Sequence, residues 1–426
     1  MEHIAKNLPT LTSRLGIGVD KNTGKYRQLI FGVLERLESA CIEITEGDER
    51  CVLGNRSSDI VGQIVVHDPS FYRETVCKGS IGAAEAFIDG KWTSPNLTIV
   101  VQIMARNQTQ LDSIDNNIRW LHAVKNWFLR KKNANSEAGS KRNILAHYDL
   151  GNDLYSRFLD SSMQYSSAIY SEQASELSQA QQNKMRTICE SLELSSEDKV
   201  IEIGTGWGGL AIYMAQHYGC HVTTTTISDA QFEYAQNKIT ALGLSERITL
   251  LKQDYRQLQG CYDKLVSIEM IEAVGHEYLP NFFDTCSNLL KDDGKMLLQS
   301  ITIADSRYDT YRKGVDFIQK YIFPGGCLPS IAVLSKAIAA NTDMVIHHIS
   351  DIGLHYARTL HDWRTLFEKQ WKEINLYGYD EQFKRLWLFY FCYCEGAFLE
   401  RVISTHHIVA RKPRYRGKYD ETVLVY

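Results

Sequence analysis

The central part of the chain alternates between short apolar runs and longer segments of helical character. The apolar runs predict strands at residues 199–203, 221–227, 247–252, 264–269 and 295–301. The segments between them predict helices at residues 210–218, 230–242 and 279–290. Strands that alternate with helices at this spacing predict an α/β fold with a doubly wound parallel sheet, which binds ligands at the carboxyl ends of its strands.

A polar segment rich in helix-breaking residues precedes this region at residues 131–140. We therefore expect a linker at 131–143. Residues 1–130 then form a smaller mixed α/β N-terminal domain, and residues 144–426 form the main domain.

An aromatic-rich segment follows the predicted sheet. Residues 383–403 predict one long helix, and a strand is expected around Ile408. The aromatic side chains of residues 387–398 are more typical of a core or an oligomer interface than of a channel wall.

Composition narrows the class of protein. The chain has 426 residues, 44% of them apolar and 23% charged, as in a globular protein of two or three domains. A net charge of −4 argues against a nucleic-acid-binding protein. The ten cysteines show no paired spacing, so we expect reduced thiols in the cytoplasm and no metal site. We find neither a signal-peptide pattern nor an apolar run long enough to cross a membrane.

A glycine-rich turn follows the first predicted strand. Residues 200–210 read V-I-E-I-G-T-G-W-G-G-L, with glycines that include Gly204, Gly206 and Gly208. Glycines let a ligand approach the backbone, but this pattern fits a dinucleotide and S-adenosylmethionine equally well. Glu202 favours the second, because its carboxylate can hold the cationic amino group of methionine. We therefore predict a methyl-donor site.

Polar residues after the second and third strands extend this site. Thr226, Ser228 and Gln231 can hydrogen-bond a nucleoside ribose, although Ser228 is equally suited to cap the following helix. Asp254 can accept a hydrogen bond from the adenine amino group, and the Tyr255 ring can cover the base. An ordinary loop is the alternative for this second pair.

Two more polar residues belong to the fourth and fifth strands. Glu272 follows the fourth strand, where burying an acid is costly unless the acid has a role. Gln299 lies within the otherwise apolar fifth strand, and a buried amide there needs partners, of which a ligand is one candidate.

Four longer motifs carry a resemblance to a known family. They are H-Y-D-L-G-N-D-L-Y at 147–155, M-Q-Y-S at 163–166, the glycine turn at 202–209, and Y-I-F-P-G-G-C-L-P-S at 321–330. Together they resemble the cyclopropane-fatty-acyl-phospholipid synthase family, and similar motifs in the same order occur in the mycolic-acid cyclopropane synthases. Residues 79–92 resemble the N-terminal domain of that family more loosely. The resemblance implies a Rossmann-like methyltransferase sheet with helical insertions, after an N-terminal domain of a lipid-recruitment type.

The family's site residues transfer onto this sequence by position. The resemblance implies that S-adenosylmethionine contacts Tyr165, Ser166, Glu202 through Gly208, Thr226 through Gln231, Tyr255 and Arg256. It also implies a catalytic bicarbonate pocket, in which Glu272, Ile301 and Tyr356 match the family. Ser167 replaces a cysteine of that pocket, and Gln299 replaces a histidine. These departures leave the product open.

The reaction implied by the resemblance is transfer of the donor methyl group to the cis double bond of an unsaturated phospholipid acyl chain. A carbocation forms on that chain, and Glu272 can stabilise it. Loss of a proton to bicarbonate then closes a cyclopropane ring, or alternatively leaves a methylene or methyl branch. A small-molecule methyltransferase and a non-catalytic lipid-binding protein are the other candidate functions.

A phospholipid substrate implies peripheral contact with the inner face of the membrane. Residues 114–132 combine an apolar stripe with a basic end, and residues 411–418 form a second basic segment. Both segments also fit ordinary solvated surface. The sequence leaves the oligomeric state open, with a homodimer as one candidate.

Overall fold

The computed structural model describes residues 23–108 and 151–417, and the chain groups into two compact units. The first unit contains Met1–Leu159, Ser306–Gly326 and Gly353–Ser404. The second unit contains Asp160–Asp305, Cys327–Ile352 and Thr405–Tyr426. The predicted linker at 131–143 lies outside the described residues, so the predicted domain boundary stays a prediction.

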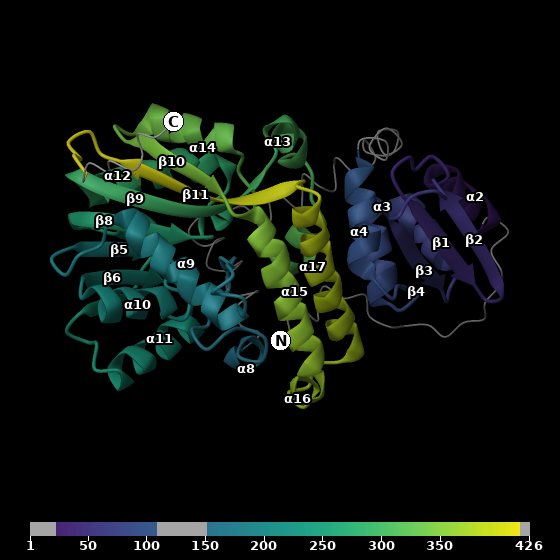
Figure 1. The fold of residues 1–426 in the computed structure, drawn as a ribbon, viewed down its shortest axis with the longest axis horizontal. Helices are drawn as coiled ribbons and strands as arrows, with labels where there is room; N and C mark the ends of the chain where they lie inside the picture. The colour runs from purple at the N-terminus through teal and green to yellow at the C-terminus, as the bar shows by residue number, and fades with distance from the viewer. Residues whose placement is uncertain (1–22, 109–150, 418–426) are drawn as a thin grey trace. The chain divides into compact units, whose positions relative to one another are not determined.

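The second unit is built on a seven-stranded sheet in the order β10-β11-β9-β8-β5-β6-β7 (Figure 1). The strands are β5 (Lys199–Ile203), β6 (His221–Thr226), β7 (Ile248–Lys252), β8 (Tyr262–Ile268), β9 (Leu290–Ile303), β10 (Val345–Asp351) and β11 (Ile403–Arg411). The pairs formed among β5 to β9 are parallel, whereas β10 runs antiparallel to β11. The predicted doubly wound α/β fold is confirmed.

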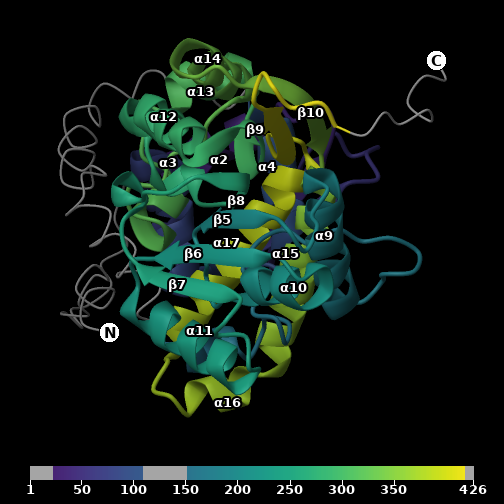
Figure 2. The ribbon, with the colours of Figure 1, turned by 90° about the vertical axis from the view of Figure 1, so that its left-hand side faces the viewer.

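Helices cover both faces of this sheet (Figure 2). The helices of one face are α9 (Leu177–Leu192), α10 (Gly209–Tyr218) and α11 (Asp229–Ala241), and those of the other are α12 (Leu279–Leu289) and α14 (Ile331–Asn341). Alternation along β5 produces the two cores. Val200 packs under α9 and α10, whereas Ile201 and Ile203 pack under α12 and α14. Glu202 therefore belongs to the face that α9 covers.

Short helical turns complete the second unit at strand ends. They are η1 (Tyr255–Gln257), η2 (Ile271–Ala273) and η3 (His276–Tyr278). Each follows the carboxyl end of β7 or β8, the edge where a doubly wound sheet binds its ligands.

The first unit holds a four-stranded sheet in the order β2-β1-β3-β4 and a set of helices. The strands are β1 (Cys41–Glu46), β2 (Glu49–Gly54), β3 (Val61–Val66) and β4 (Trp92–Thr93). The helices are α2 (Thr23–Leu34), α3 (Ser70–Ile88), α4 (Leu97–Arg106), α8 (Asn152–Tyr155), α15 (Gly353–Lys369), α16 (Trp371–Asn375), α17 (Glu381–Leu399) and the π-helix η4 (Ile318–Ile322). One more helix, α13, spans Asp305–Tyr311.

Helix α17 explains why distant parts of the chain share the first unit. Helix α4 packs so closely on it that a Cβ atom at Gly396 would lie 2.7 Å from Val101 Cγ1. Thr98 Oγ1 donates to Glu395 Oε2 at 2.9 Å in the same contact. Buried contacts, rather than proximity along the chain, therefore hold the N-terminal helix α4 and the C-terminal helix α17 together.

The aromatic residues of α17 form a core, as the sequence favoured. Trp387 and Phe391 are fully buried, and Phe158 contacts both rings at centroid distances of 5.5 and 5.6 Å. The helix ends earlier than predicted, at Leu399, and Ile403 already belongs to β11. Arg401, with φ of 55°, adopts a left-handed conformation that reverses the chain between them.

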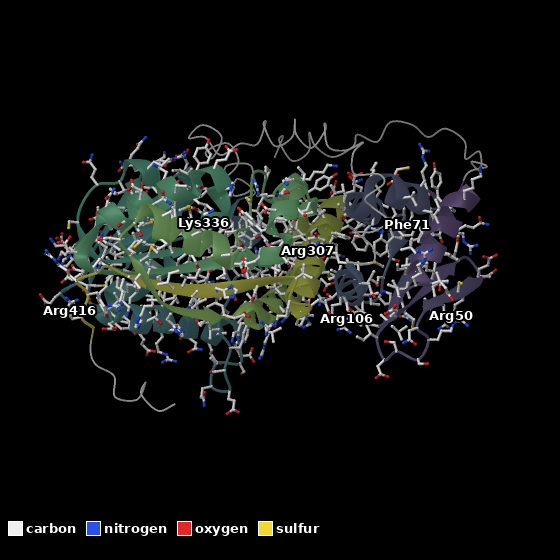
Figure 3. The ribbon with its side chains drawn as sticks, turned by 90° about the horizontal axis from the view of Figure 1, so that it is seen from above. Arg50, Phe71, Arg106, Arg307, Lys336 and Arg416 are labelled. Carbon is white, nitrogen blue, oxygen red and sulfur yellow. The ribbon has the colours of Figure 1, made fainter. Side chains whose placement is uncertain are left out.

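The two segments considered for membrane contact differ in what the structure describes. Residues 114–132 lie outside the described residues. In the second segment, Lys412 is buried and its Nζ lies 2.6 Å from Asp343 Oδ1, while Arg414 pairs with Asp292 at 3.0 Å. Arg416 lies at the periphery (Figure 3). No helix of the described residues has both the length and the apolar character that crossing a bilayer requires.

Candidate active site

The glycine turn connects β5 to α10 in a conformation that only glycine adopts without strain. Gly204, Gly206 and Gly208 have φ values of 99°, 53° and 85°. Gly209 is required for a different reason, because a Cβ atom there would lie 2.3 Å from the carbonyl oxygen of Ser162. The turn therefore keeps its backbone open at the carboxyl end of β5, as a ligand-binding loop requires.

Glu202 is a buried carboxyl group just before this turn. Only 2% of the residue is exposed, and Thr224 Oγ1 donates to Glu202 Oε2 at 2.5 Å. Burial raises the pKa of Glu202 to about 7, against opposing hydrogen bonds and the charge of Lys184. A carboxylate deprived of water favours a cationic partner, and the amino group of S-adenosylmethionine is such a group. The residues at this turn thus fit the predicted donor.

The residues after β6 form a small hydrogen-bonded cluster. Thr226 Oγ1 donates to Gln231 Oε1 at 2.9 Å. Ser228 Oγ accepts from the Gln231 backbone N–H at 3.3 Å and caps α11. The helix-cap role considered for Ser228 is therefore present, and all three side chains lie at the strand edge that carries the glycine turn.

The residues after β7 are tied together on a single turn. Arg256 donates to Asp254 from Nε and from a terminal nitrogen, each at 2.8 Å. The Tyr255 ring packs edge-on against Phe282 at a centroid distance of 5.4 Å. Arg256 neutralises the carboxylate of Asp254, so this acid is not an isolated charge in the site.

The Tyr165–Ser167 segment is fixed from two sides, and its two serines are buried. Ser166 Oγ lies 2.7 Å from the ammonium nitrogen of Lys184. The backbone N–H of Ser167 donates to Glu269 Oε1 at 3.0 Å, and Ser167 Oγ donates to the carbonyl oxygen of Ala168 at 3.1 Å. The segment is thereby attached to α9 and to the end of β8.

Only one carboxyl oxygen of Glu272 accepts hydrogen bonds from the residues that the structure describes. Its Oε1 accepts from the Ile301 backbone N–H at 2.5 Å and from Ser300 Oγ at 3.2 Å. Its Oε2 is buried and has no hydrogen-bond partner among residues 23–108 and 151–417. Burial, assisted by the negative charge of Glu269, raises the pKa of Glu272 to about 8. This acid is therefore mainly protonated at neutral pH.

Gln299 is fully buried and uses both ends of its amide. Its Nε2 donates to Glu269 Oε1 at 2.7 Å and to the carbonyl oxygen of Ser167 at 3.4 Å. Its Oε1 lies 2.8 Å from His407 Nε2. Burial lowers the pKa of His407 to about 3, so the imidazole is neutral and donates to Gln299. Gln299 thus supports the wall of the site and has its hydrogen-bonding groups occupied by protein.

Tyr356 and Ile301 complete the residues predicted for the bicarbonate pocket. Ile301 contributes its backbone N–H to Glu272, as described above. Tyr356 belongs to the first unit, where its ring stacks on Phe398 at a centroid distance of 4.6 Å. The structure thus brings Ser167, Glu272, Gln299 and Ile301 to one strand edge of the second unit.

Two functional residues escaped the sequence analysis, Lys184 and His407. Each carried a signal. Lys184 falls on the apolar stripe of α9, between Gln181 and Ile188, where a charged residue is out of place. His407 alternates with the buried Val409 along β11 and so faces the same core.

Comparisons with known proteins agree with this geometry. Residues 135–408 match the family model for mycolic acid cyclopropane synthetase. The chain is 36% identical to the cyclopropane-fatty-acyl-phospholipid synthase of Escherichia coli K12, over 81% of this chain and 87% of that protein. It is 34% identical to the tuberculostearic acid methyltransferase UfaA1 of Mycobacterium tuberculosis, over 79% and 80% of the two chains.

A solved structure supports the assignment of the fold and donor. The mycolic acid cyclopropane synthase CmaA1, solved with SAH and CTAB, superposes with a TM-score of 0.60 at 27% identity. The match covers 64% of this chain and 98% of that one. From the matched family, the open glycine turn and the buried Glu202 beside it, we conclude that the chain belongs to the mycolic acid cyclopropane synthetase family of S-adenosylmethionine-dependent methyltransferases.

Proposed function

We propose that this enzyme transfers the methyl group of S-adenosylmethionine to the cis double bond of an unsaturated phospholipid acyl chain and forms a cyclopropane ring. The observation that carries the proposal is Glu272, an acid just after β8 whose Oε2 is buried and has no partner among the residues that the structure describes. The similarity to the E. coli cyclopropane-fatty-acyl-phospholipid synthase supports the substrate class.

The donor site is assigned to the residues around the glycine turn. Glu202 binds the amino group of the donor, and the backbone of Gly204, Gly206 and Gly208 admits it. Thr226, Ser228 and Gln231 lie where a ribose binds, and Asp254, Tyr255 and Arg256 where an adenine binds. Tyr165 and Ser166 close the site from the segment attached to α9. When bound, S-adenosylmethionine supplies a methyl group on a positively charged sulfur.

The protonation of Glu272 defines its role. An alkene is a weak nucleophile, and its methylation leaves a carbocation on the acyl chain, which an anion stabilises. Because Glu272 is mainly protonated at neutral pH, its Oε2 acts as a hydrogen-bond donor rather than as the anion itself. We propose that it holds bicarbonate, which supplies a negative charge and a base for the proton that leaves.

The remaining residues of the pocket shape it. Ile301 N–H fixes one carboxyl oxygen of Glu272, Oε1. The side-chain amide of Gln299 supports Ser167 by a hydrogen bond to its carbonyl oxygen. Its N–H groups are engaged by protein acceptors. The role of Tyr356, which belongs to the first unit, stays a prediction from the family resemblance. Buried walls of this kind exclude water, which would trap a carbocation as an alcohol.

A methylene or methyl branch is the alternative product. Two observations support this alternative product. Gln299 replaces the histidine of the family, and the chain is similar to a protein named tuberculostearic acid methyltransferase. Loss of a proton from the added methyl group, with bond formation to the cationic carbon, gives a ring. Loss of a proton from a chain carbon beside the cation gives a methyl branch with a double bond retained. A hydride shift that moves the cation to the methylated carbon, followed by proton loss from the methyl group, gives a methylene branch. The position of the base decides between them.

Expression in a bacterial host that makes monounsaturated phospholipids, but no cyclopropane lipids, tests the proposal. Mass spectrometry of the fatty acids, followed by double-bond derivatisation, should show a gain of one CH₂ and loss of the double bond. A gain of CH₂ with a derivatisable double bond would identify a branched product instead. Unaltered fatty acids in cells that accumulate folded protein, with Glu272→Leu as the inactive control, would contradict the function.

We further propose that the enzyme meets its lipid as a peripheral protein at the cytoplasmic face of the membrane, and that a homodimer is its working form. Residues 114–132 and the basic segment at 411–418 support membrane contact by composition. Vesicle flotation with anionic and neutral lipids, at low and high salt, tests the contact. Sedimentation velocity tests the dimer.

A further inference from the structure

A buried lysine lies beside the donor site in the second unit. Lys184, on α9, is fully buried. Its Nζ donates to Gln164 Oε1 at 2.9 Å and to Ser166 Oγ at 2.7 Å. Burying an ammonium group costs several kcal/mol unless nearby charges and hydrogen bonds compensate, so the position calls for an explanation.

The charges around Lys184 come from three different parts of the fold. Burial lowers the pKa of Lys184 to about 8, and the carboxylates of Glu269, Asp160 and Glu202 oppose this shift. Glu269 follows β8, Asp160 precedes the Tyr165–Ser167 segment, and Glu202 lies on β5. Lys184 is therefore the cation common to three carboxylates.

The sheet explains why these groups meet. Glu202 alternates with Val200 on the face of the sheet that α9 covers. Gln299 and His407 share that face, because each is two residues from a strand residue packed under the same helix, Leu297 and Val409 respectively. Helix α9 therefore places the charged side chain of Lys184 over these three polar residues, at one end of a layer that is otherwise apolar.

We propose that Lys184 is a positioning residue for the methyl donor: its buried ammonium group holds the Gln164–Ser166 segment in place and puts a positive charge over the sheet face that carries Glu202. This inference rests on the donor site assigned above. Lys184 acts through other residues, and it is not placed in contact with the donor.

The first part of this role is mechanical. Gln164 and Ser166 flank Tyr165, so two hydrogen bonds from one ammonium group fix the residue between them. Gln181, one turn earlier on α9, donates to the carbonyl oxygen of Ser166 at 3.0 Å. Asp160 accepts from the Gln164 backbone N–H at 3.1 Å. Without Lys184, the side chains of Gln164 and Ser166 lose their shared donor, while the backbone keeps these two contacts.

The second part is electrostatic. Burial raises the pKa of Glu202 to about 7, and Lys184 is the charged group that lowers it. The other groups on this side are the acids Glu269 and Asp160, which act on Lys184, and the neutral His407. Loss of the ammonium charge therefore moves the ionisation of Glu202 to higher pH and weakens its hold on a cationic amino group at neutral pH.

Calorimetric titration of the purified full chain with S-adenosylhomocysteine tests this role without any turnover. Lys184→Met removes the charge and the hydrogen bonds at nearly constant volume. Lys184→Gln removes the charge but keeps a donor, so it carries the test if the methionine variant does not fold. Each variant is titrated across a pH series around 7, and its thermal unfolding midpoint is recorded.

Lys412→Met is the matched control. Lys412 is also a buried lysine of the second unit, and its Nζ contacts Asp343 and Ser287. It lies towards the amino end of β9, because its backbone N–H donates to the carbonyl oxygen of Gly294, whereas the glycine turn follows the carboxyl end of β5. This variant is expected to lower the unfolding midpoint while leaving the ligand affinity within a factor of two.

The expected result is about a tenfold weaker affinity for Lys184→Met at neutral pH, and about a threefold weaker affinity for Lys184→Gln. In both variants the pH at which affinity reaches half its maximum should rise by about one unit. An unchanged affinity and pH profile in a folded variant would overturn the inference while leaving the donor site intact. An equal loss in Lys412→Met would also overturn it, since the effect would then be general instability. Failure of the wild-type chain to bind the ligand would overturn the donor site itself.

Discussion

The unusual protonation of Glu272 gives the sharpest prediction about this enzyme. Replacement by glutamine keeps the shape and the acceptor that receives the Ile301 N–H, but it removes the titration. In the folded protein the pKa of Glu272 is raised to about 8, from an ordinary value of 4.5. The folded state therefore holds the proton more tightly than the unfolded state. Its contribution to stability is complete below pH 4.5 and is lost as the pH rises towards 8.

The magnitude follows from these two pKa values. Ionising the acid in the unfolded chain, while the folded chain stays protonated, costs the wild type about 1 kcal/mol at about pH 5 and about 3 kcal/mol at about pH 7. Glu272→Gln has no carboxyl group to ionise at this position, so its unfolding free energy carries no such loss. The difference in unfolding free energy, variant minus wild type, should therefore rise by about 2 kcal/mol over that range.

Urea unfolding of both proteins at several pH values measures this difference. The slope with pH is the diagnostic quantity, because other titrating groups are common to both chains and the unpaired amide adds an offset that does not depend on pH. A difference that stays flat between about pH 5 and about pH 7 would refute the assignment of a protonated Glu272. In lipid assays the same variant should keep measurable activity, since its amide can donate as the protonated acid does.

Four further predictions follow from other contacts. Gly209→Ala should abolish binding of S-adenosylhomocysteine and lower the thermal unfolding midpoint, because the added methyl group would lie 2.3 Å from the Ser162 carbonyl oxygen; a variant that binds normally would contradict the geometry of the turn. Glu85→Gln in the first unit should destabilise the chain by about 2 kcal/mol at neutral pH. Burial alone would raise the pKa of Glu85, but two lysines and a tyrosine hydroxyl outweigh it and lower the pKa from 4.5 to about 2, so the effect should fade as the pH falls from 4.5 towards 2. Gln299→Leu should cost about 2–4 kcal/mol in urea unfolding by leaving Glu269 with one donor fewer, whereas a neutral result would remove the bracing role. Removal of bicarbonate from buffers purged of carbon dioxide should stop turnover, and its addition should restore it; full activity in purged buffer would exclude it as the base.

The sequence predicted the fold because the relevant information is local. The predicted strand at 199–203 coincides with β5, since apolar runs bounded by polar residues need no distant contact to be recognised. The predictions were wrong mainly at the ends of helices and strands. The predicted helix at 383–403 ran past Leu399 because the left-handed turn at Arg401 has no sequence signal of its own.

The candidate site was predictable where residue type and sequence spacing alone indicate the chemistry. Glu202 and the glycines stand next to each other in the chain, so their association follows from spacing. Lys184 and His407 lie far from them in sequence. Their contacts with Ser166 and Gln299 depend on how α9 and β11 pack on the sheet.

The sequence by itself determined the strand and helix pattern, the glycine turn, the family motifs and thus the chemistry of the methyl donor. Only the tertiary structure decided the protonation of Glu272, the engagement of Gln299 and the burial of Lys184. The physical reason is that hydrophobic periodicity and backbone conformation are properties of neighbouring residues. A pKa or a hydrogen-bond partner instead depends on which distant groups share a region without water.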